Sequence, residues 1–261
     1  MFSLLRILAI IFAVLITLAI LLQDFMIFFP QPVSSFSKKS ILPEFKAFEY
    51  RSQIDDVELA GWLISRESKT LLIYFGGNGE EVSHNLPDFV QNFNCDILLM
   101  NYRGYGDSEG KPSEKSFFRD ADHLYDQTIK KLAPEKIILM GRSLGSSVAS
   151  YLAQSRGCNG LIMITPFDSI QSVASSMFPF LPVSLILKHK FRSDLYVQNQ
   201  TCKTLVIIAE DDEIISRKHA DALISSFPIP PTIALINGAG HNNIQEFAGY
   251  WEPLRLFLEN P

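Results

Sequence analysis

A serine between two glycines stands at the centre of the segment 136–147, which reads KIILMGRSLGSS. The apolar half predicts a strand that runs directly into a turn, and the small residues after Ser143 predict a helix. This strand–turn–helix context is what a nucleophile elbow requires, because its strained backbone exposes the serine hydroxyl at the end of a sheet. A Cβ at Gly141 or Gly145 would collide with the neighbouring strand or helix. The context therefore favours a nucleophilic Ser143 over a chance match to Gly-x-Ser-x-Gly.

Two later segments supply the partners that a serine nucleophile needs. A serine hydroxyl is a weak nucleophile, so it requires a base to take its proton and a third group to orient that base. Four carboxylates, Glu210 to Glu213, follow the apolar run 205–209, and a glycine-rich stretch ending at His241 follows the run 233–236. Acid and base thus follow the serine in that order. Each stands at the carboxyl end of a predicted parallel strand, where the sites of open α/β sheets gather.

Of the five histidines in the chain, His241 is the preferred base. Its glycine-rich loop leaves it free to reach Ser143. The other four stand in helical or polar contexts and are expected to be solvated surface groups: His84, His123, His189 and His219.

The acid has three candidates. Asp212 is the first choice because the loop needs a few residues after its strand before it turns back toward the histidine. Asp211 is second, and Asp168, after the preceding strand, is third. A divalent metal held by Asp211, Asp212 and Glu213 is a competing interpretation, but no second cluster of ligands supports it. The sequence therefore predicts a Ser143–His241–Asp212 triad with no metal and no cofactor.

A glycine-rich turn after an early strand is placed to stabilise an oxyanion. Acyl transfer needs preorganised N–H donors at the developing negative charge. Leu144, directly after the serine, supplies one, and the turn 76–79 (GGNG) after the strand 71–75 supplies the other, assigned to Asn78 with Gly77 as the neighbouring candidate. A phosphate-binding loop is the rival interpretation, but no Lys-Ser or Lys-Thr pair follows and the spacing is not GxGxxG.

The N-terminus is long and apolar enough to cross a membrane. No charge interrupts the stretch 7–22, and residues 2–22, with Arg6 free to snorkel, provide about twenty residues for a helix. Pro30 and Pro32 end any helix there. We expect an uncleaved, single-span anchor at residues 1–29, with a polar linker over 30–44.

Two other interpretations fit this stretch less well. A cleaved signal peptide would need a small-residue triplet of the A-x-A kind, and none follows the apolar run. A buried core helix would show a polar face to water, which this stretch lacks. Arg6 on one side and Lys38, Lys39 and Lys46 on the other nearly cancel in the positive-inside rule, so the orientation stays open.

The rest of the chain has the pattern of one α/β domain, residues 45–261. Residues 45–50 and 57–65 alternate as an antiparallel hairpin turning near 54–56. Short runs that are apolar on both faces then alternate with predicted helices near 82–93, 114–131, 144–155, 217–226 and 243–258, as a buried parallel sheet requires. The predicted strands are Leu71–Phe75, Ile97–Asn101, Lys136–Met140, Leu161–Thr165, Leu205–Ala209 and Ile233–Ile236.

One insertion interrupts this alternation, at about residues 167–200. It is rich in apolar and aromatic side chains, and Pro179 and Pro182 prevent a single long helix. Because such a long apolar loop is rarely structureless, we interpret it as a small cap over the site. An additional pair of packing helices is the alternative, and the two interpretations are compatible.

Composition limits the partners. A net charge of −5 leaves no basic footprint for nucleic acid. The cysteines Cys95, Cys158 and Cys202 are far apart in sequence and form no CxxC pair, so they are read as small buried hydrophobes or free thiols, with one disulfide left open. The 261 residues, 47% of them hydrophobic, suffice for one sizeable core.

Five motifs in order resemble the α/β-hydrolase superfamily, and more narrowly its serine-aminopeptidase-like branch: FGGNG (75–79), NYRGYGDS (101–108), GRSLG (141–145), DDEII (211–215) and GAGHN (238–242). The resemblance covers about residues 45–258, and FFPQP (28–32) after the apolar stretch is also similar. Membrane-anchored members of the branch include depalmitoylating thioesterases. The resemblance implies an α/β-hydrolase fold with Ser143 as nucleophile, Asp212 as acid and His241 as base. One departure is Gly76, which stands where the branch usually has a histidine.

These observations predict a membrane-anchored serine hydrolase that cleaves a carboxylic ester or thioester of an acylated or lipid-like substrate. A catalytically inert hydrolase-like domain that binds at a membrane is one alternative. A serine aminopeptidase is another, and it would need an acidic group in the pocket to hold the substrate amine. Fold and triad alone do not determine the substrate.

Overall fold

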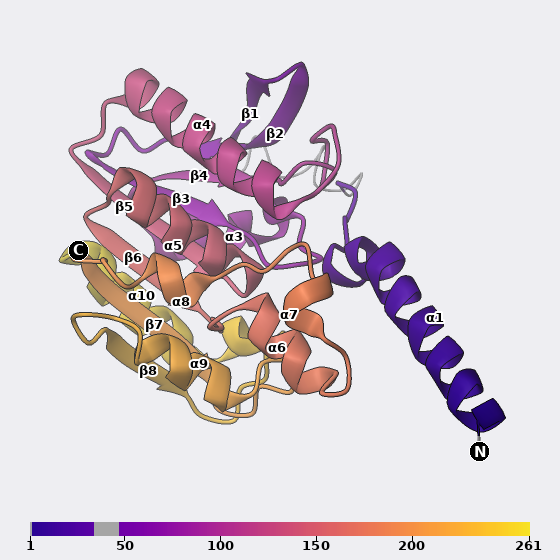
Figure 1. Cartoon of the computed structure of the whole chain (residues 1–261). Helices are drawn as coiled ribbons and strands as arrows, with labels where there is room; N and C mark the ends of the chain where they lie inside the picture. The colour runs from indigo at the N-terminus through magenta and orange to yellow at the C-terminus, as the bar shows by residue number, and fades with distance from the viewer. Residues whose placement is uncertain (1, 34–46) are drawn as a thin grey trace.

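A computed structural model of the chain describes residues 2–33 and 47–261, and its core is one eight-stranded sheet (Figure 1). The strands are β1 (Ala47–Ile54), β2 (Val57–Ile64), β3 (Thr70–Phe75), β4 (Asp96–Met100), β5 (Lys136–Arg142), β6 (Gly160–Ile164), β7 (Lys203–Ala209) and β8 (Thr232–Ile236). Their order in the sheet is β1-β2-β4-β3-β5-β6-β7-β8. β2 pairs antiparallel with β1 and β4, and every other neighbouring pair is parallel. The predicted mostly parallel sheet with an N-terminal antiparallel hairpin is therefore confirmed.

Helices cover both faces of this sheet. Successive side chains of a strand point to opposite faces, so Ile73 packs with α4 and α5 while Leu72 and Tyr74 pack with α3 and α10. Outside the insertion between β6 and β7, the helices after β3 are α3 (Leu86–Asn92), α4 (Glu114–Leu132), α5 (Leu144–Arg156), α9 (Arg217–Ile224) and α10 (Ala248–Glu259), with 3-10 turns at Val82–Asn85 and Ile244–Glu246. Two hydrophobic cores result, one on each face of the sheet.

The predicted elements differ from the observed ones mainly at their ends. The hairpin turns at Asp55 and Asp56, both with positive φ, where the sequence predicted the turn. The helix predicted over 243–258 is divided into a 3-10 turn and α10. The first two residues of the predicted hairpin and most of the predicted linker 30–44 lie outside the described residues.

The insertion between β6 and β7 contains three short helices, α6 (Ile170–Met177), α7 (Val183–Ile186) and α8 (Ser193–Tyr196). Pro179 and Pro182 lie between α6 and α7, as expected of residues that interrupt a helix. Several apolar side chains of this segment face solvent, including Phe180 at 89% and Leu185 at 84% exposure. We call the segment 167–200 the cap, and its role as a cover remains a prediction.

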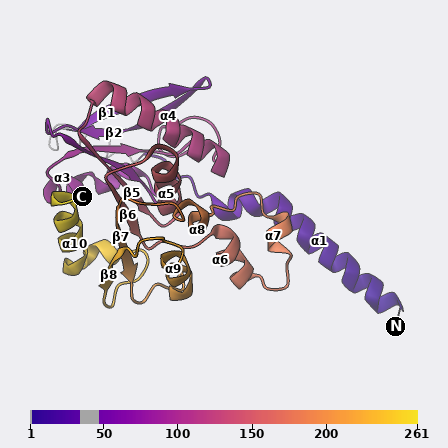
Figure 2. The ribbon, with the colours of Figure 1, turned by 60° about the vertical axis from the view of Figure 1, so that its left-hand side comes forward.

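The N-terminal stretch is one helix, α1 (Phe2–Ile27), which projects from the body beside α6 and α7 in both views (Figures 1 and 2). Its portion Ser3–Ile27 is long and apolar enough to cross a membrane, by length and composition, and its most apolar window is unburied. Its last residue, Ile27, and the following Phe28 are nevertheless buried in the hydrophobic core on the α4–α5 face of the sheet. Phe28 packs edge-on against Phe117 and His189. The end of α1 is thus part of the folded domain.

Two of the cysteines that are distant in sequence meet in space. The sulfur atoms of Cys158, before β6, and Cys202, before β7, are 3.0 Å apart. Cys95 is buried separately, and burial raises the pKa of its thiol to about 12. Neighbouring parallel strands begin side by side, which is why residues more than forty positions apart come into contact here.

Candidate active site

Ser143 stands at a sharp turn between β5 and α5. Its backbone has φ 49° and ψ −114°, a conformation that a non-glycine residue rarely adopts. The strained turn is held from both sides, since the Ser143 N–H donates to the carbonyl of Ile164 at 2.8 Å and the Ser143 carbonyl accepts from the N–H and hydroxyl of Ser146. A residue kept in such a conformation by its surroundings is expected to serve function rather than folding.

The two glycines of the motif leave no room for a side chain. A Cβ on Gly141 would lie 2.1 Å from the carbonyl oxygen of Gly145. A Cβ on Gly145 would lie 2.1 Å from the carbonyl oxygen of Phe75 on β3. The expected collision with a neighbouring strand or helix is thereby confirmed, and it shows how closely α5 approaches the sheet at Ser143.

Asp212 and His241 form a buried hydrogen-bonded pair. The Nδ1 atom of His241 lies 2.8 Å from Oδ2 of Asp212, and the two side chains are 6% and 7% exposed. The other carboxylate oxygen accepts the N–H groups of Ile214 at 3.0 Å and Ile215 at 2.7 Å, which fixes the Asp212 side chain. Because Nδ1 faces the carboxylate, Nε2 is the atom left for proton exchange with a substrate or nucleophile.

The other candidate acids lie elsewhere. Asp211 is exposed, and its backbone N–H bonds to the carbonyl of Ala239. Asp168 bonds through Oδ1 to Nδ1 of a different histidine, His219, at 2.8 Å. Within residues 2–33 and 47–261, no group of three or more His, Cys, Asp or Glu side chains is arranged to hold a metal ion. The geometry therefore favours Asp212 as the partner of His241.

The expectation that the other histidines are solvated is wrong for two of them. His219 is buried against Asp168 and within 3.4 Å of the Ser172 hydroxyl. His189 is buried and lies 3.1 Å from Asp24 of α1. Both sit where the cap meets another element, so tertiary packing rather than local polarity decides their burial.

Two charged residues that the sequence reasoning did not assign hold the His241 backbone. The carboxylate of Glu213 accepts the His241 N–H at 3.0 Å, and this bond lowers the pKa of Glu213. The guanidinium of Arg142 donates to the His241 carbonyl at 3.0 Å. Arg142 lies inside the Gly-x-Ser-x-Gly motif and Glu213 inside the acidic run, but their roles depend on loops meeting in space.

The predicted oxyanion donors lie around the serine. Leu144 is the first residue of α5, where a backbone N–H has no partner within its own helix. In the turn after β3, the N–H of Gly77 already donates to Glu80 at 2.8 Å, which favours the N–H of Asn78 as the second donor. The Asn78 side chain has another task, since its amide bonds to the carbonyl of Ile27 and to the N–H of Phe29 after α1.

Ser143 and His241 open into the same cavity, whose volume is about 730 Å³. This volume lies within the range of small-molecule sites. No hydrogen bond joins the Ser143 hydroxyl to His241 in the described part of the chain, so the two share the cavity without being bonded. Most of the wall is apolar and comes from α1 and the residue Phe29 after it, from the cap, and from the loop after β7: Ala19, Met26, Ile27, Phe29, Phe167, Ile170, Val173, Ala174, Met177, Phe178, Leu181, Val183, Ile186, Leu187, Ile214 and Ile215.

Fold and site together define an α/β-hydrolase, and comparison with known proteins gives the same result. The family model "Serine aminopeptidase, S33" matches residues 67–203. An uncharacterized protein of Mycobacterium tuberculosis is 28% identical over 90% of this chain and 87% of its own length. Human alpha/beta hydrolase domain-containing protein 17C is 31% identical over 74% of this chain and 59% of its own length.

The fold also matches a solved esterase. The Pyrococcus furiosus esterase Pf2001 superposes with a TM-score of 0.69 at 17% identity, covering 88% of this chain and 95% of the esterase. The chain belongs to the serine aminopeptidase S33 family of the α/β-hydrolase superfamily.

Proposed function

We propose that this protein is a membrane-anchored serine hydrolase that cleaves carboxylic esters or thioesters through an acyl-enzyme on Ser143. The observation that carries the proposal is the buried Asp212–His241 pair, which lines the same apolar cavity as a serine held in a strained turn. The esterase of similar fold and the hydrolase relatives support ester chemistry.

The reaction follows from this geometry in two halves. The Ser143 hydroxyl turns toward Nε2 of His241 as it attacks the acyl carbon, and His241 takes its proton. The imidazolium that forms is stabilised by Asp212, and the oxyanion accepts hydrogen bonds from the N–H groups of Leu144 and Asn78. The alcohol or thiol leaves with the proton from His241. A water molecule, deprotonated by His241, then cleaves the acyl-enzyme and restores the serine.

The contacts made by the end of α1 support an anchor rather than a cleaved signal sequence. Ile27 and Phe28 are buried in the domain, and Asn78 and Tyr105 bond to the backbone at Ile27 and Phe29. Removal of α1 would expose these contacts. An apolar helix of this length, joined to an apolar cavity, fits an enzyme that acts on acylated or lipid-like substrates at a membrane.

An aminopeptidase would need a carboxylate in the cavity that is available to a substrate amine. Glu80 lines the cavity, but its carboxylate already accepts hydrogen bonds from Tyr74, Gly77 and Asn85, and Arg142 lies 3.8 Å away. A carboxylate with so many donors is a poor site for a further cation, so ester or thioester cleavage is the better fit.

Labelling with a fluorophosphonate probe tests the proposal. The full-length protein in phospholipid vesicles is expected to label, whereas Ser143→Ala is expected not to. Ser176→Ala, on the exposed side of α6, serves as the matched control and should label like the wild type. Equal labelling of wild type and Ser143→Ala would refute an activated serine. It would leave the inert binding domain as the better description.

A further inference from the structure

The last turns of α1 form part of the cavity wall. Ala19, Gln23, Met26 and Ile27 line the cavity, and their spacing of four, three and one residues places them on one face of the helix. From Ala19 to Ile27 the helix rises about 12 Å, enough to run beside much of an extended acyl chain. The opposite side of the helix, at Leu21 and Phe25, is exposed and does not line the cavity.

The end of α1 is joined to the loop that carries the proposed oxyanion donor. The Asn78 amide donates to the carbonyl of Ile27, and its oxygen accepts the N–H of Phe29 at 3.2 Å. Tyr105 completes this contact, because its hydroxyl lies 3.0 Å from both the Phe29 N–H and the Asn78 oxygen. Burial raises the pKa of Tyr105 to about 12, so its hydroxyl stays protonated as a donor. The position of α1 is thus coupled to the position of Asn78.

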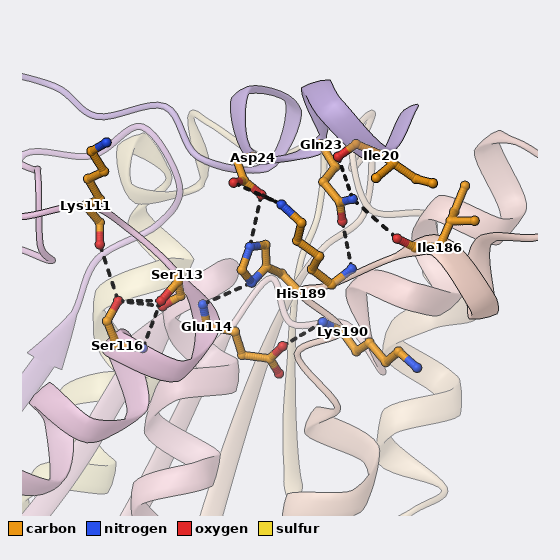
Figure 3. A network of polar contacts seen from close by, with 11 residues as sticks. Ile20, Gln23, Asp24, Lys111, Ser113, Glu114, Ser116, Ile186, His189 and Lys190 are labelled. Carbon is orange, nitrogen blue, oxygen red and sulfur yellow. Dashed lines mark hydrogen bonds and ion pairs between the residues drawn. The ribbon is translucent and has the colours of Figure 1, made fainter. Parts of the chain in front are cut away.

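The same helix is also joined to the cap (Figure 3). The buried Gln23 accepts the N–H of Lys188 at 2.7 Å and donates to the carbonyl of Ile186 at 3.3 Å. Asp24 bonds to the ring of His189 at 3.1 Å, and the other ring nitrogen of His189 accepts the N–H of Glu114 at the start of α4. Gln23 and Asp24 are the two polar residues in the last two turns of the otherwise apolar end of α1, and both hold the cap segment 186–190 against the helix.

The cap presents apolar side chains to solvent beside α1. Met177 at the end of α6, Phe180 in the following loop and Leu185 in α7 are all largely exposed. α7 lies alongside α1 in both ribbon views (Figures 1 and 2) and contacts it. Exposed aromatic and aliphatic groups next to a helix that can span a membrane are costly in water and are stable in a bilayer.

We propose that α1 is a wall of the substrate site and that the acyl chain of a membrane-resident ester or thioester enters from the bilayer between α1 and α6–α7. This inference rests on the proposed function and names its substrate class. A chain that moves from the hydrocarbon core into an apolar cavity is not exposed to water on the way, so uptake carries no large hydrophobic cost. Long acyl chains would contact Ala19 and Met26, whereas short ones would reach only the pocket beside Ser143.

Chain-length selectivity in the full-length protein tests this wall. Hydrolysis of p-nitrophenyl butyrate and p-nitrophenyl palmitate is measured in phosphatidylcholine vesicles for wild type, Ala19→Trp and Leu21→Trp. Ala19→Trp fills the cavity and is expected to lower kcat/KM for the palmitate ester at least tenfold relative to the butyrate ester. Leu21→Trp places the same ring on the opposite side of α1 at nearly the same depth and should leave the ratio unchanged.

Fluorophosphonate labelling of each variant distinguishes failure of the α1 wall from failure of the proposed function. If Ala19→Trp labels at Ser143 like the wild type but keeps the wild-type ratio, or if Leu21→Trp lowers the ratio equally, α1 is not a wall of the site. If the wild type neither labels nor hydrolyses either ester, the proposed function itself fails and this inference fails with it. Should Ala19→Trp fail to fold, Met26→Trp with Phe25→Trp as its control repeats the comparison about two turns further along the helix.

Discussion

The loops around Ser143 and the α1–cap wall are built in opposite ways, although they enclose one cavity. Around Ser143 and His241, hydrogen bonds hold the backbone, and the side chains of His241 and Asp212, the proposed partners of the serine, are almost fully buried. In the α1–cap wall, apolar side chains face outward, with Phe180 and Leu185 among the most exposed. The loops around Ser143 are fixed by hydrogen bonds, whereas the α1–cap wall presents an outer surface suited to an apolar phase.

This difference indicates a division of work. A reaction at an acyl carbon needs donors and bases at fixed distances, which only a rigid framework provides. Recognition of an acyl chain needs area without directional bonds, which apolar side chains on short helices provide. Changes on the rigid side should therefore affect rate or stability strongly, and changes on the apolar side should affect substrate preference or membrane contact.

The largest effect is expected for the Asp212 carboxylate. Asp212→Asn keeps the shape but removes the charge that orients and stabilises His241, so kcat for p-nitrophenyl butyrate should fall about 10⁴-fold. Asp211→Asn, one residue away and exposed, is the matched control and should leave kcat close to the wild type. A larger loss in Asp211→Asn than in Asp212→Asn would reverse the assignment of the acid.

The next effect concerns stability on the rigid side. Gly145→Ala places a Cβ against the carbonyl oxygen of Phe75, and we expect the free energy of unfolding to drop by about 4 kcal/mol. Gly249→Ala in α10 meets nothing nearer than 4.0 Å and should stabilise the helix by about 0.5–1 kcal/mol. Thermal unfolding of both variants measures the contrast. Near-equal melting temperatures would mean that α5 can move away from the sheet.

The smallest effect on stability is expected in the cap. Phe180→Trp should change the free energy of unfolding by less than about 0.5 kcal/mol, because the site is exposed. In vesicles containing brominated lipid, the added tryptophan should be quenched, whereas Leu256→Trp on the exposed side of α10 should not be. Equal quenching, or none, at the two positions would show that the cap does not meet the bilayer and would remove the contrast between the two regions.

Much of the fold was predictable because local pattern carries it. Strand runs that are apolar on both faces, turn residues such as Asp55 and Asp56, and prolines between α6 and α7 each act over a few residues. The prediction that His189 and His219 are solvated was wrong because their surroundings depend on contacts that are distant in sequence. Their burial is decided by Asp24 and Asp168, which are distant in sequence, and no local signal marks such partners.

By itself, the sequence determined the strand order along the chain, the strained serine turn with its two glycines, and the apolar character of α1, because each depends on neighbours within a few residues. Only the tertiary structure decided that Asp212 rather than Asp211 bonds to His241, that Cys158 meets Cys202, and that α1 lines the cavity. The physical reason is distance. These contacts join segments that are far apart in sequence and come together only when the sheet and both hydrophobic cores form. No short stretch of residues encodes that geometry.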